Sequence, residues 1–323
     1  MHEKDNQHWA HLCEAGTLYG LYFLLGVQKI FGRRVFSLML HPVSLYFLLF
    51  RGSARRASLD YLRKHYEFQP EAWKQRPGYG MVYRHFMAFG EVVLDKLLAW
   101  SKEMTEAEFV PEDEEALTDL QTDTRGQLII GSHLGNLEYC RGFMQRYKSR
   151  TINVLLYDQH AANFVRVMQK IDPQSRMNVY QVNELDIPRI LQLKQKIDSG
   201  EWLFIAGDRV PLSGNERTAD VEFLGHQAPF PEGPYILART LACPVKFMFS
   251  YREGEHICFS VKAFAESIKL PTKNREEFLQ AQAQAFAQEL ERHCIKAPLQ
   301  WFNFYEFWGK KTPTNTEREL ARE

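Results

Sequence analysis

The sequence predicts an α/β fold in which a mixed, largely parallel sheet is flanked by helices. Short apolar segments alternate with longer amphipathic segments from about residue 126 onward, an order typical of parallel sheets covered by helices. The last two apolar segments are expected to form an antiparallel pair. In addition, 45% of the 323 residues are hydrophobic, which is enough for a large buried core.

Each predicted element has its own local signal. Strands are expected where short apolar runs lie between turn residues, at 127–130, 151–157, 178–182, 201–206, 245–251 and 257–263. Helices are expected at 161–170, 187–199, 232–242 and from 274 onward. Pro188 fits the first turn of its helix, and Gly200 closes that helix. Asn274 and Glu277 form a variant of the capping box at the start of the last helix.

Membrane association is predicted for the amino-terminal region. Two uncharged apolar runs, 15–28 and 35–50, are separated by Arg33 and Arg34. Both are shorter than the ~18 to 20 residues that a membrane-spanning helix needs, and Pro42 interrupts the second. The segment 29–64 carries eight Lys or Arg and one acid, which suits helices lying at a membrane interface. Core helices of a soluble domain and a single tilted transmembrane helix are the alternatives.

Composition argues against several other functions. The chain has 40 basic and 40 acidic side chains and no net charge, so no nucleic acid partner is expected. The polar opening, residues 1–8, is unlike a cleaved signal peptide. None of the five cysteines forms a Cys-x-x-Cys pair, so neither a disulfide framework nor a zinc site is expected. No cofactor and no metal are predicted.

His133 and Glu138 are the most informative residues. The strand 127–130 is followed by Gly131 and Ser132, and a helix is expected from residue 134, so His133 should lie at the carboxyl edge of the sheet, where open α/β folds bind ligands. A neutral His can take a proton from a substrate hydroxyl, and a carboxylate such as Glu138 can fix its tautomer. The alternative is a structural, hydrogen-bonded histidine.

Asp208 and Arg209 follow the predicted strand 201–206 directly. They should therefore emerge at the same edge as His133. Arg209 offers a fork of donors for phosphate or carboxylate, and Asp208 can orient it or bind a substrate hydroxyl. An ordinary salt bridge in a turn is the alternative.

The string Gly131-Ser-His-Leu-Gly-Asn-Leu-Glu138 resembles the first signature block of the late acyltransferases of lipid A biosynthesis, a branch of the lysophospholipid acyltransferase superfamily. In this block the His is followed five residues later by an acidic residue, which is Glu138 here. Glycerolipid members of the superfamily usually carry Asp at that acidic position, whereas the lipid A branch tends to use Glu. The segments 202–209, 221–233 and 235–245 resemble later blocks in the same order, and the opening around Trp9 resembles the family's amino-terminal region. The similarity extends through most of residues 9–310.

This resemblance implies an enzyme that moves a fatty acyl group from a thioester donor, expected to be acyl carrier protein, to a hydroxyl of a lipid or glycolipid such as a lipid A precursor. It implies that His133 is the general base and Glu138 its orienter, with backbone amides of the 131–135 turn stabilising the oxyanion. The expected substrate-binding residues are Asp208, Arg209, Arg176, Arg217 and Asn163, with Arg166 near the last. The implied location is the cytoplasmic face of the bacterial inner membrane, peripheral or monotopic.

The resemblance leaves alternatives open. They are acyl transfer in another bacterial lipid or aryl polyene pathway, a thioesterase or phospholipase that uses water, and a non-catalytic lipid-binding protein. The aromatic stretch 301–308 can line an acyl pocket, dock on the membrane or pack in the core. The expected division is a helical membrane-associating region at 1–66, a helical and acidic connecting region at 67–125, a catalytic domain of the lysophospholipid acyltransferase type at 126–310, and a polar tail at 311–323.

Overall fold

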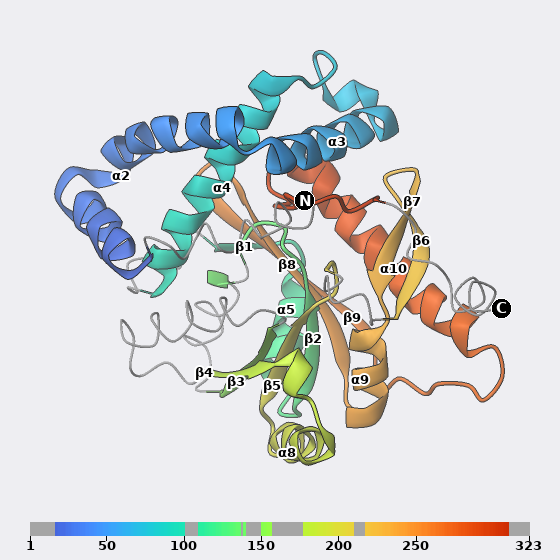
Figure 1. The fold of residues 1–323 in the computed structure, drawn as a ribbon. Coiled ribbons are helices and arrows are strands. Elements are labelled where there is room, and N and C mark those ends of the chain that lie inside the picture. The colour runs from blue at the N-terminus through green and yellow to red at the C-terminus, as the bar shows by residue number, and fades with distance from the viewer. Residues whose placement is uncertain are drawn as a thin grey trace.

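A computed structural model describes residues 17–100, 109–136, 138–139, 150–156, 177–209 and 217–309. Within these ranges seven strands form one sheet in the order β1-β9-β8-β2-β5-β3-β4 (Figure 1). Every neighbouring pair is parallel except β8 and β9. The predicted mixed, largely parallel sheet is therefore confirmed. Its strands are β1 Phe109–Pro111, β2 Gln127–Gly131, β3 Ile152–Leu156, β4 Met177–Gln181, β5 Trp202–Ala206, β8 Val245–Glu253 and β9 His256–Ala265.

Helices pack against the faces of this sheet (Figure 1). They are α5 Glu114–Thr122, α8 Ile187–Asp198, α9 Gly233–Leu241 and α10 Arg275–Lys296. Strand β2 is buried along its whole length, as a central parallel strand covered on both faces should be. Helices α8, α9 and α10 agree with the predicted segments to within two residues, and the helix predicted at 161–170 lies outside the described residues.

A two-stranded antiparallel hairpin, β6 Thr218–Phe223 and β7 His226–Pro231, stands apart from the main sheet. The sequence analysis did not predict it. An exposed strand edge needs hydrogen-bond partners, and α10 supplies them to β6 through side chains. Gln280 donates to the carbonyl of Asp220 at 2.7 Å, and Gln284 both donates to the carbonyl of Glu222 and accepts from its amide. The hairpin is thereby fixed to α10.

Three long helices precede the sheet: α2 Thr17–Phe50, α3 Gly52–Phe68 and α4 Tyr79–Trp100. Helix α2 is two helices joined at Gly32, whose φ of 75° and ψ of 177° are not helical. The break lies beside Arg33 and Arg34, where the sequence separates the two apolar runs. In the described part of the chain, no single helix combines the length and apolarity needed to cross a bilayer, whereas the segments Ile30–Phe50 and Gly52–Phe68, bent by 94°, meet that criterion as a pair.

Helices α3 and α4 share a core with the sheet. Tyr61 and Val82 are fully buried in the same cluster as Leu128 and Ile130 of β2. Strand β1, which lies in the predicted connecting region, joins the sheet by pairing with β9. The boundaries proposed at residues 66, 125 and 310 stay predictions, and the packing across the first two is continuous.

Two local predictions were wrong. Leu134 does not begin a helix: it forms a β-bridge with Trp301, and the described helical residues nearby are Glu138 and Tyr139. Asn274 does not cap α10 with its side chain, because its backbone is left-handed, with a φ of 56°, and no side-chain cap bond forms. In both places a tertiary contact or backbone conformation overrides a local preference.

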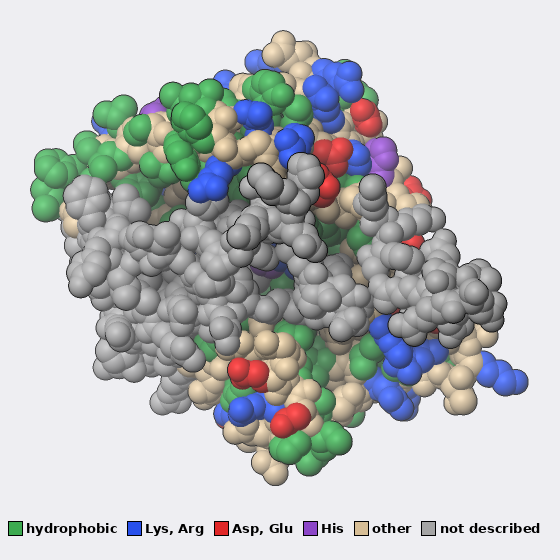
Figure 2. Space-filling view, viewed as in Figure 1, with side chains coloured by type: hydrophobic (Ala, Val, Ile, Leu, Met, Phe, Trp, Pro, Cys, Tyr) green, Lys and Arg blue, Asp and Glu red, His purple; other side chains and the backbone are tan. Residues whose placement is uncertain are grey.

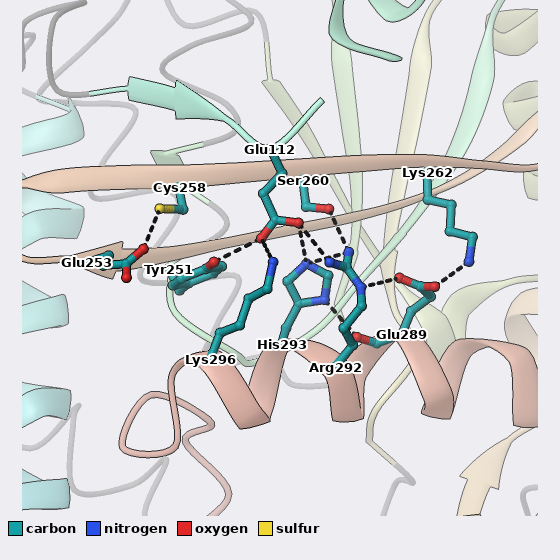
Figure 3. Close-up of polar contacts among 10 residues, drawn as sticks. All are labelled: Glu112, Tyr251, Glu253, Cys258, Ser260, Lys262, Glu289, Arg292, His293 and Lys296. Atoms are coloured by element: carbon teal, nitrogen blue, oxygen red, sulfur yellow. Dashed lines mark hydrogen bonds and ion pairs between the residues drawn. The ribbon is translucent and has the colours of Figure 1, made fainter. Parts of the chain in front are cut away.

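An ion-pair cluster joins the segment after β1 to the end of α10 (Figure 3). The carboxylate of Glu112 accepts from the Tyr251 hydroxyl at 2.8 Å, from Lys296 at 2.8 Å and from Arg292 at 3.0 Å. Burial opposes its ionisation, but contacts with His293, Lys296 and Tyr251 outweigh burial and hold the pKa of Glu112 far below its usual range. The cluster extends through Arg292 and Lys262 to Glu289.

Replacing Glu112 tests whether this cluster stabilises the fold. Because its folded-state pKa is lowered, its contribution is complete above the ordinary glutamate pKa and is lost as the pH falls toward the folded-state value. Glu112→Gln should lower the free energy of unfolding by about 2 kcal/mol near pH 7, and the difference from wild type should shrink below about pH 4.5. Urea unfolding at both pH values measures it.

The matched control is Glu266→Gln. Glu266 also pairs with an arginine, at 2.6 Å from Arg125, but 80% of its side chain is exposed. Exposed pairs of this kind contribute about 0–1 kcal/mol. Equal losses in the two variants would show that the Glu112 cluster is no more important than a surface ion pair.

Candidate active site

The parallel register of β2 and β5 builds the site. Gly131, the last residue of β2, is opposite Ala206, the last residue of β5. The amide of Gly207 then donates to the carbonyl of Gly131 at 2.8 Å. Two residues beyond each strand end stand His133 and Asp208, so the register alone brings an imidazole and a carboxylate to the same sheet edge.

His133 and Asp208 make two hydrogen bonds. The imidazole Nδ1 is 2.8 Å from Asp208 Oδ1, and the backbone amide of His133 donates to Asp208 Oδ2 at 2.7 Å. A carboxylate accepts only, so Nδ1 carries the proton and Nε2 keeps its lone pair in the neutral ring. The Asp208 side chain is 1% exposed, whereas that of His133 is 33% exposed. A buried carboxylate, Asp208, thus holds an imidazole, His133, that is accessible from outside.

The protonation states of the pair favour proton abstraction. Burial is the main cause that lowers the pKa of His133 below its usual value, the positive charge of Arg209 lowers it further, and Asp208 opposes both. Burial opposes ionisation of Asp208, but its contacts with His133 outweigh burial and lower its pKa. Near neutral pH the site therefore holds a neutral imidazole against an ionised carboxylate, as a histidine general base requires.

The turn after His133 needs glycine. Gly135 has a φ of 61°, and a Cβ there would lie 1.8 Å from the carbonyl oxygen of Ser250. This close approach lets Asn136 donate its amide to the same Ser250 carbonyl at 3.3 Å, while the Ser250 hydroxyl donates to the Asn136 carbonyl at 2.6 Å. Any side chain at position 135 would displace the turn from β8.

Several backbone amides of the same turn, which is expected to stabilise the oxyanion, are engaged inside the protein. The amide of His133 donates to Asp208, that of Leu134 to the Ser132 hydroxyl at 3.1 Å, and that of Gly135 to the carbonyl of Gln300 at 2.8 Å. Three of the five amides predicted for this role are thus already used inside the protein. The part that this turn plays in stabilising an oxyanion therefore rests on its remaining amides, those of Gly131 and Ser132, and stays a prediction.

Glu138 lies in the helical turn beyond His133 and is partly buried, and its amide donates to the side-chain oxygen of Asn136 at 3.0 Å. The sequence predicts that Glu138 orients His133. In the structure Asp208 occupies Nδ1, the nitrogen that an orienting carboxylate normally contacts. A catalytic role for Glu138 stays a prediction.

The other predicted substrate-binding residues do not all lie at the same place. Arg209 is partly buried, donates to the Phe302 carbonyl at 3.4 Å and lies 6.0 Å from the Tyr305 ring. Arg217 is exposed and immediately precedes β6, where its carbonyl accepts from the amide of Glu232 at 3.1 Å. Arg176, Asn163 and Arg166 lie outside the described residues.

The described part of the chain shows neither a metal-binding cluster nor an activated cysteine. No group of three or more His, Cys, Asp or Glu gathers there in a way that could hold a metal ion. Cys243, Cys258 and Cys294 are free and buried. Burial raises the pKa of the Cys243 thiol to about 11, which makes it a poor nucleophile. Cys13 and Cys140 lie outside the described residues.

Comparison with protein families gives one result. A family model described as bacterial lipid A biosynthesis acyltransferase matches residues 3–310. The search of curated proteins finds no match. The matched range contains His133, Glu138, Asp208 and Arg209.

Two substitutions should move the pH dependence of turnover in opposite directions. Arg209 lowers the pKa of His133 and Asp208 raises it. Arg209→Gln should therefore move the acid limb of the kcat profile to higher pH, because His133 becomes protonated more easily. Asp208→Asn should move the limb to lower pH and reduce kcat by up to about 10⁴-fold, since the tautomer is no longer fixed. Profiles that move in the same direction would contradict this electrostatic account.

Proposed function

Because the chain belongs to the bacterial lipid A biosynthesis acyltransferase family, we propose that His133 is the general base that activates the hydroxyl of a lipid A precursor for acyl transfer. The single observation that carries the proposal is the contact between His133 Nδ1 and the buried Asp208 carboxylate. It leaves Nε2 as the basic nitrogen of a ring whose side chain is one-third exposed.

The proposed reaction has two steps. His133 Nε2 takes the proton of the acceptor hydroxyl while the oxygen attacks the thioester carbonyl, and a tetrahedral intermediate forms. When the intermediate collapses, the carbon–sulfur bond breaks and the thiolate takes the proton back from His133. The products are an ester and a free thiol. Asp208 stays ionised throughout and stabilises the transient imidazolium.

Arg209 is proposed to stabilise negative charge in this site. Its guanidinium has the donor geometry for a phosphate or an oxyanion, and its charge acts on His133. With three turn amides already engaged, Arg209 is a natural candidate for part of the oxyanion's stabilisation.

Glu138 is proposed as a second carboxylate that assists His133. Arg176, Arg217 and Asn163 are proposed as contacts to more distant parts of the acceptor.

Acyl carrier protein is the proposed donor, and a lipid A precursor the acceptor that the family implies. A purified enzyme assay with acyl carrier protein and coenzyme A thioesters of the same chain compares the two carriers. Preference for the coenzyme A thioester would overturn the proposed donor. Thiol release that needs no acceptor would indicate a hydrolase instead of an acyltransferase.

Lipid A acyltransferases act at the inner membrane, and α2 is the proposed contact. Hydrophobic side chains gather over α2 in the space-filling view (Figure 2). They include Ile30, Phe31, Leu38 and Phe50, each more than 60% exposed. Arg51 and other basic side chains adjoin this face. An amphipathic surface of this kind suits peripheral or monotopic binding at the cytoplasmic leaflet.

Removing the base should abolish transfer. His133→Ala should reduce kcat by about 10²- to 10⁴-fold, and it should also lower stability, because the buried Asp208 carboxylate loses one of its three donors. Glu138→Gln should keep a weaker activity. Steady-state rates with purified protein, together with thermal unfolding as a check of folding, decide the matter. A His133→Ala enzyme that keeps more than about a tenth of wild-type turnover would rule out the general base.

The apolar face of α2 should be required for membrane binding. Leu38→Asp combined with Phe50→Asp should reduce flotation with anionic liposomes at high salt, because the salt-resistant part of binding comes from apolar burial. The control is Ile187→Asp with Leu191→Asp on α8, whose side chains are 76% and 58% exposed. If the control pair loses binding as much as the α2 pair, the loss is nonspecific and α2 is not the contact.

A further inference from the structure

The second oxygen of Asp208 has a donor that the proposed reaction does not use. Trp301 Nε1 donates to Asp208 Oδ2 at 3.0 Å, and the same oxygen accepts the backbone amide of His133. Both Trp301 and Asp208 are buried, at 0% and 2% exposure. An indole nitrogen can only donate, so this contact satisfies a buried donor and adds a third hydrogen bond to a buried charge.

The Trp301 ring is held in place on several sides. It makes edge-on contacts with Tyr61 of α3 at 5.0 Å, Phe223 of β6 at 5.1 Å and Phe307 at 5.0 Å between ring centroids. Aromatic packing of this kind fixes a ring in one orientation. The burial of Trp301, Phe302, Phe304 and Phe307 argues against these residues as a membrane-docking surface and shows that their rings pack in the core. The acyl-pocket role of this stretch stays a prediction.

The backbone around Trp301 pairs with the turn that carries His133. Phe302 donates its amide to the carbonyl of His133 at 3.2 Å, and Gly135 donates to the carbonyl of Gln300 at 2.8 Å. These two bonds enclose the Leu134–Trp301 bridge. One short segment, 300–302, therefore fixes the main chain of the base and the side chain of its partner together.

The amino-terminal helices in turn hold Trp301. His85 of α4 contacts the Trp301 carbonyl through Nε2 at 3.1 Å, and its Nδ1 is 2.9 Å from the hydroxyl of Ser58 on α3. A carbonyl only accepts, so Nε2 carries the proton and Ser58 donates to Nδ1. Burial lowers the pKa of His85 to about 3, which keeps it neutral and preserves this arrangement at physiological pH.

We propose that Trp301 is a positioning residue for acyl transfer: its indole N–H fixes the Asp208 carboxylate, and Asp208 fixes His133. The proposal rests on the proposed function, since it assumes that His133 is the base. Trp301 itself touches neither the proton nor the substrate in this scheme. Its effect should therefore appear in kcat and in the pH dependence of kcat, with KM little changed.

The direction of the pH effect follows from the charge on Asp208. Without the indole donor, the carboxylate is less stabilised and attracts the proton of His133 more strongly. Trp301→Phe should therefore move the acid limb of the kcat profile to higher pH. The other charges acting on His133, those of Arg209 and of Lys96 on α4, are unchanged by this substitution. Cys294 near Asp208 stays neutral, because burial raises its pKa.

Trp301→Phe should lower kcat about tenfold, the order expected for one hydrogen bond to a charged group. Phenylalanine also leaves a cavity, so a second variant carries benzothienylalanine at position 301. That residue keeps the shape of indole and replaces only the N–H by sulfur. If both variants show the kcat loss and the pH shift, the hydrogen bond is responsible. If only Trp301→Phe loses activity, packing explains the loss and the proposal is wrong.

Trp73→Phe is the matched control. Trp73 donates its indole N–H to His65 Nδ1 at 2.9 Å, and His65 contacts the Cys294 carbonyl at 3.1 Å. This link is of the same kind, joins α3 to α10, and has no bond to Asp208. Its loss should reduce stability without moving the acid limb. An equal shift in this control would show that general loosening, rather than Asp208, controls the profile.

A double-mutant comparison separates this proposal from the proposed function. In an Asp208→Asn background, Trp301→Phe should cost less than about threefold in kcat, because residues acting through one another are not additive. A full additional tenfold loss would overturn the positioning role. If instead His133→Ala is active, the proposed function fails. If His133→Ala is inactive while the 301 variants match wild type, only the positioning role fails.

Discussion

The site depends on the satisfaction of one buried carboxylate. A charge that is 2% exposed, as Asp208 is, is strongly destabilising unless donors surround it. Asp208 has three: the His133 ring, the His133 amide and the Trp301 indole. Each donor constrains the geometry of the others. The requirement to pair the charge therefore also sets the orientation of the His133 ring, so the geometry of the candidate site follows from a condition of folding.

This condition links distant parts of the chain. Asp208 follows β5, His133 follows β2, and Trp301 follows α10. Through His85, Ser58 and Tyr61, Trp301 also contacts α3 and α4. The amino-terminal helices are thus a structural support for the site as well as a candidate membrane contact. A catalytic domain cut at residue 126 would lack the residues that surround Trp301, and its exposed aromatic surface would favour aggregation.

Sequence reasoning worked where the signal is local. The apolar strands β2 and β5 and the position of His133 and Asp208 at their ends could be predicted, because parallel strands place their carboxyl ends at one edge. The carboxylate that pairs with the His133 ring could not be predicted. Glu138 is five residues from His133, whereas Asp208 is 75 residues away, and only the register of β2 against β5 shows which carboxylate reaches Nδ1. The use of the turn amides by Ser132 and Gln300, and the donor role of Trp301, are likewise long-range or side-chain details that no periodicity encodes.

The lowered pKa of His133 would suit the proposed general base if the enzyme works beside a membrane. An anionic cytoplasmic leaflet carries a surface potential of roughly −30 mV, which concentrates protons and lowers the local pH by roughly half a unit relative to bulk. A histidine with an ordinary pKa would be partly protonated there and unable to accept a proton. Burial and the nearby Arg209 charge both favour the neutral ring of His133, which would keep the proposed base able to accept a proton at such a surface. The Arg209 charge, which is proposed to stabilise negative charge in the site, therefore also favours the neutral form of the proposed base.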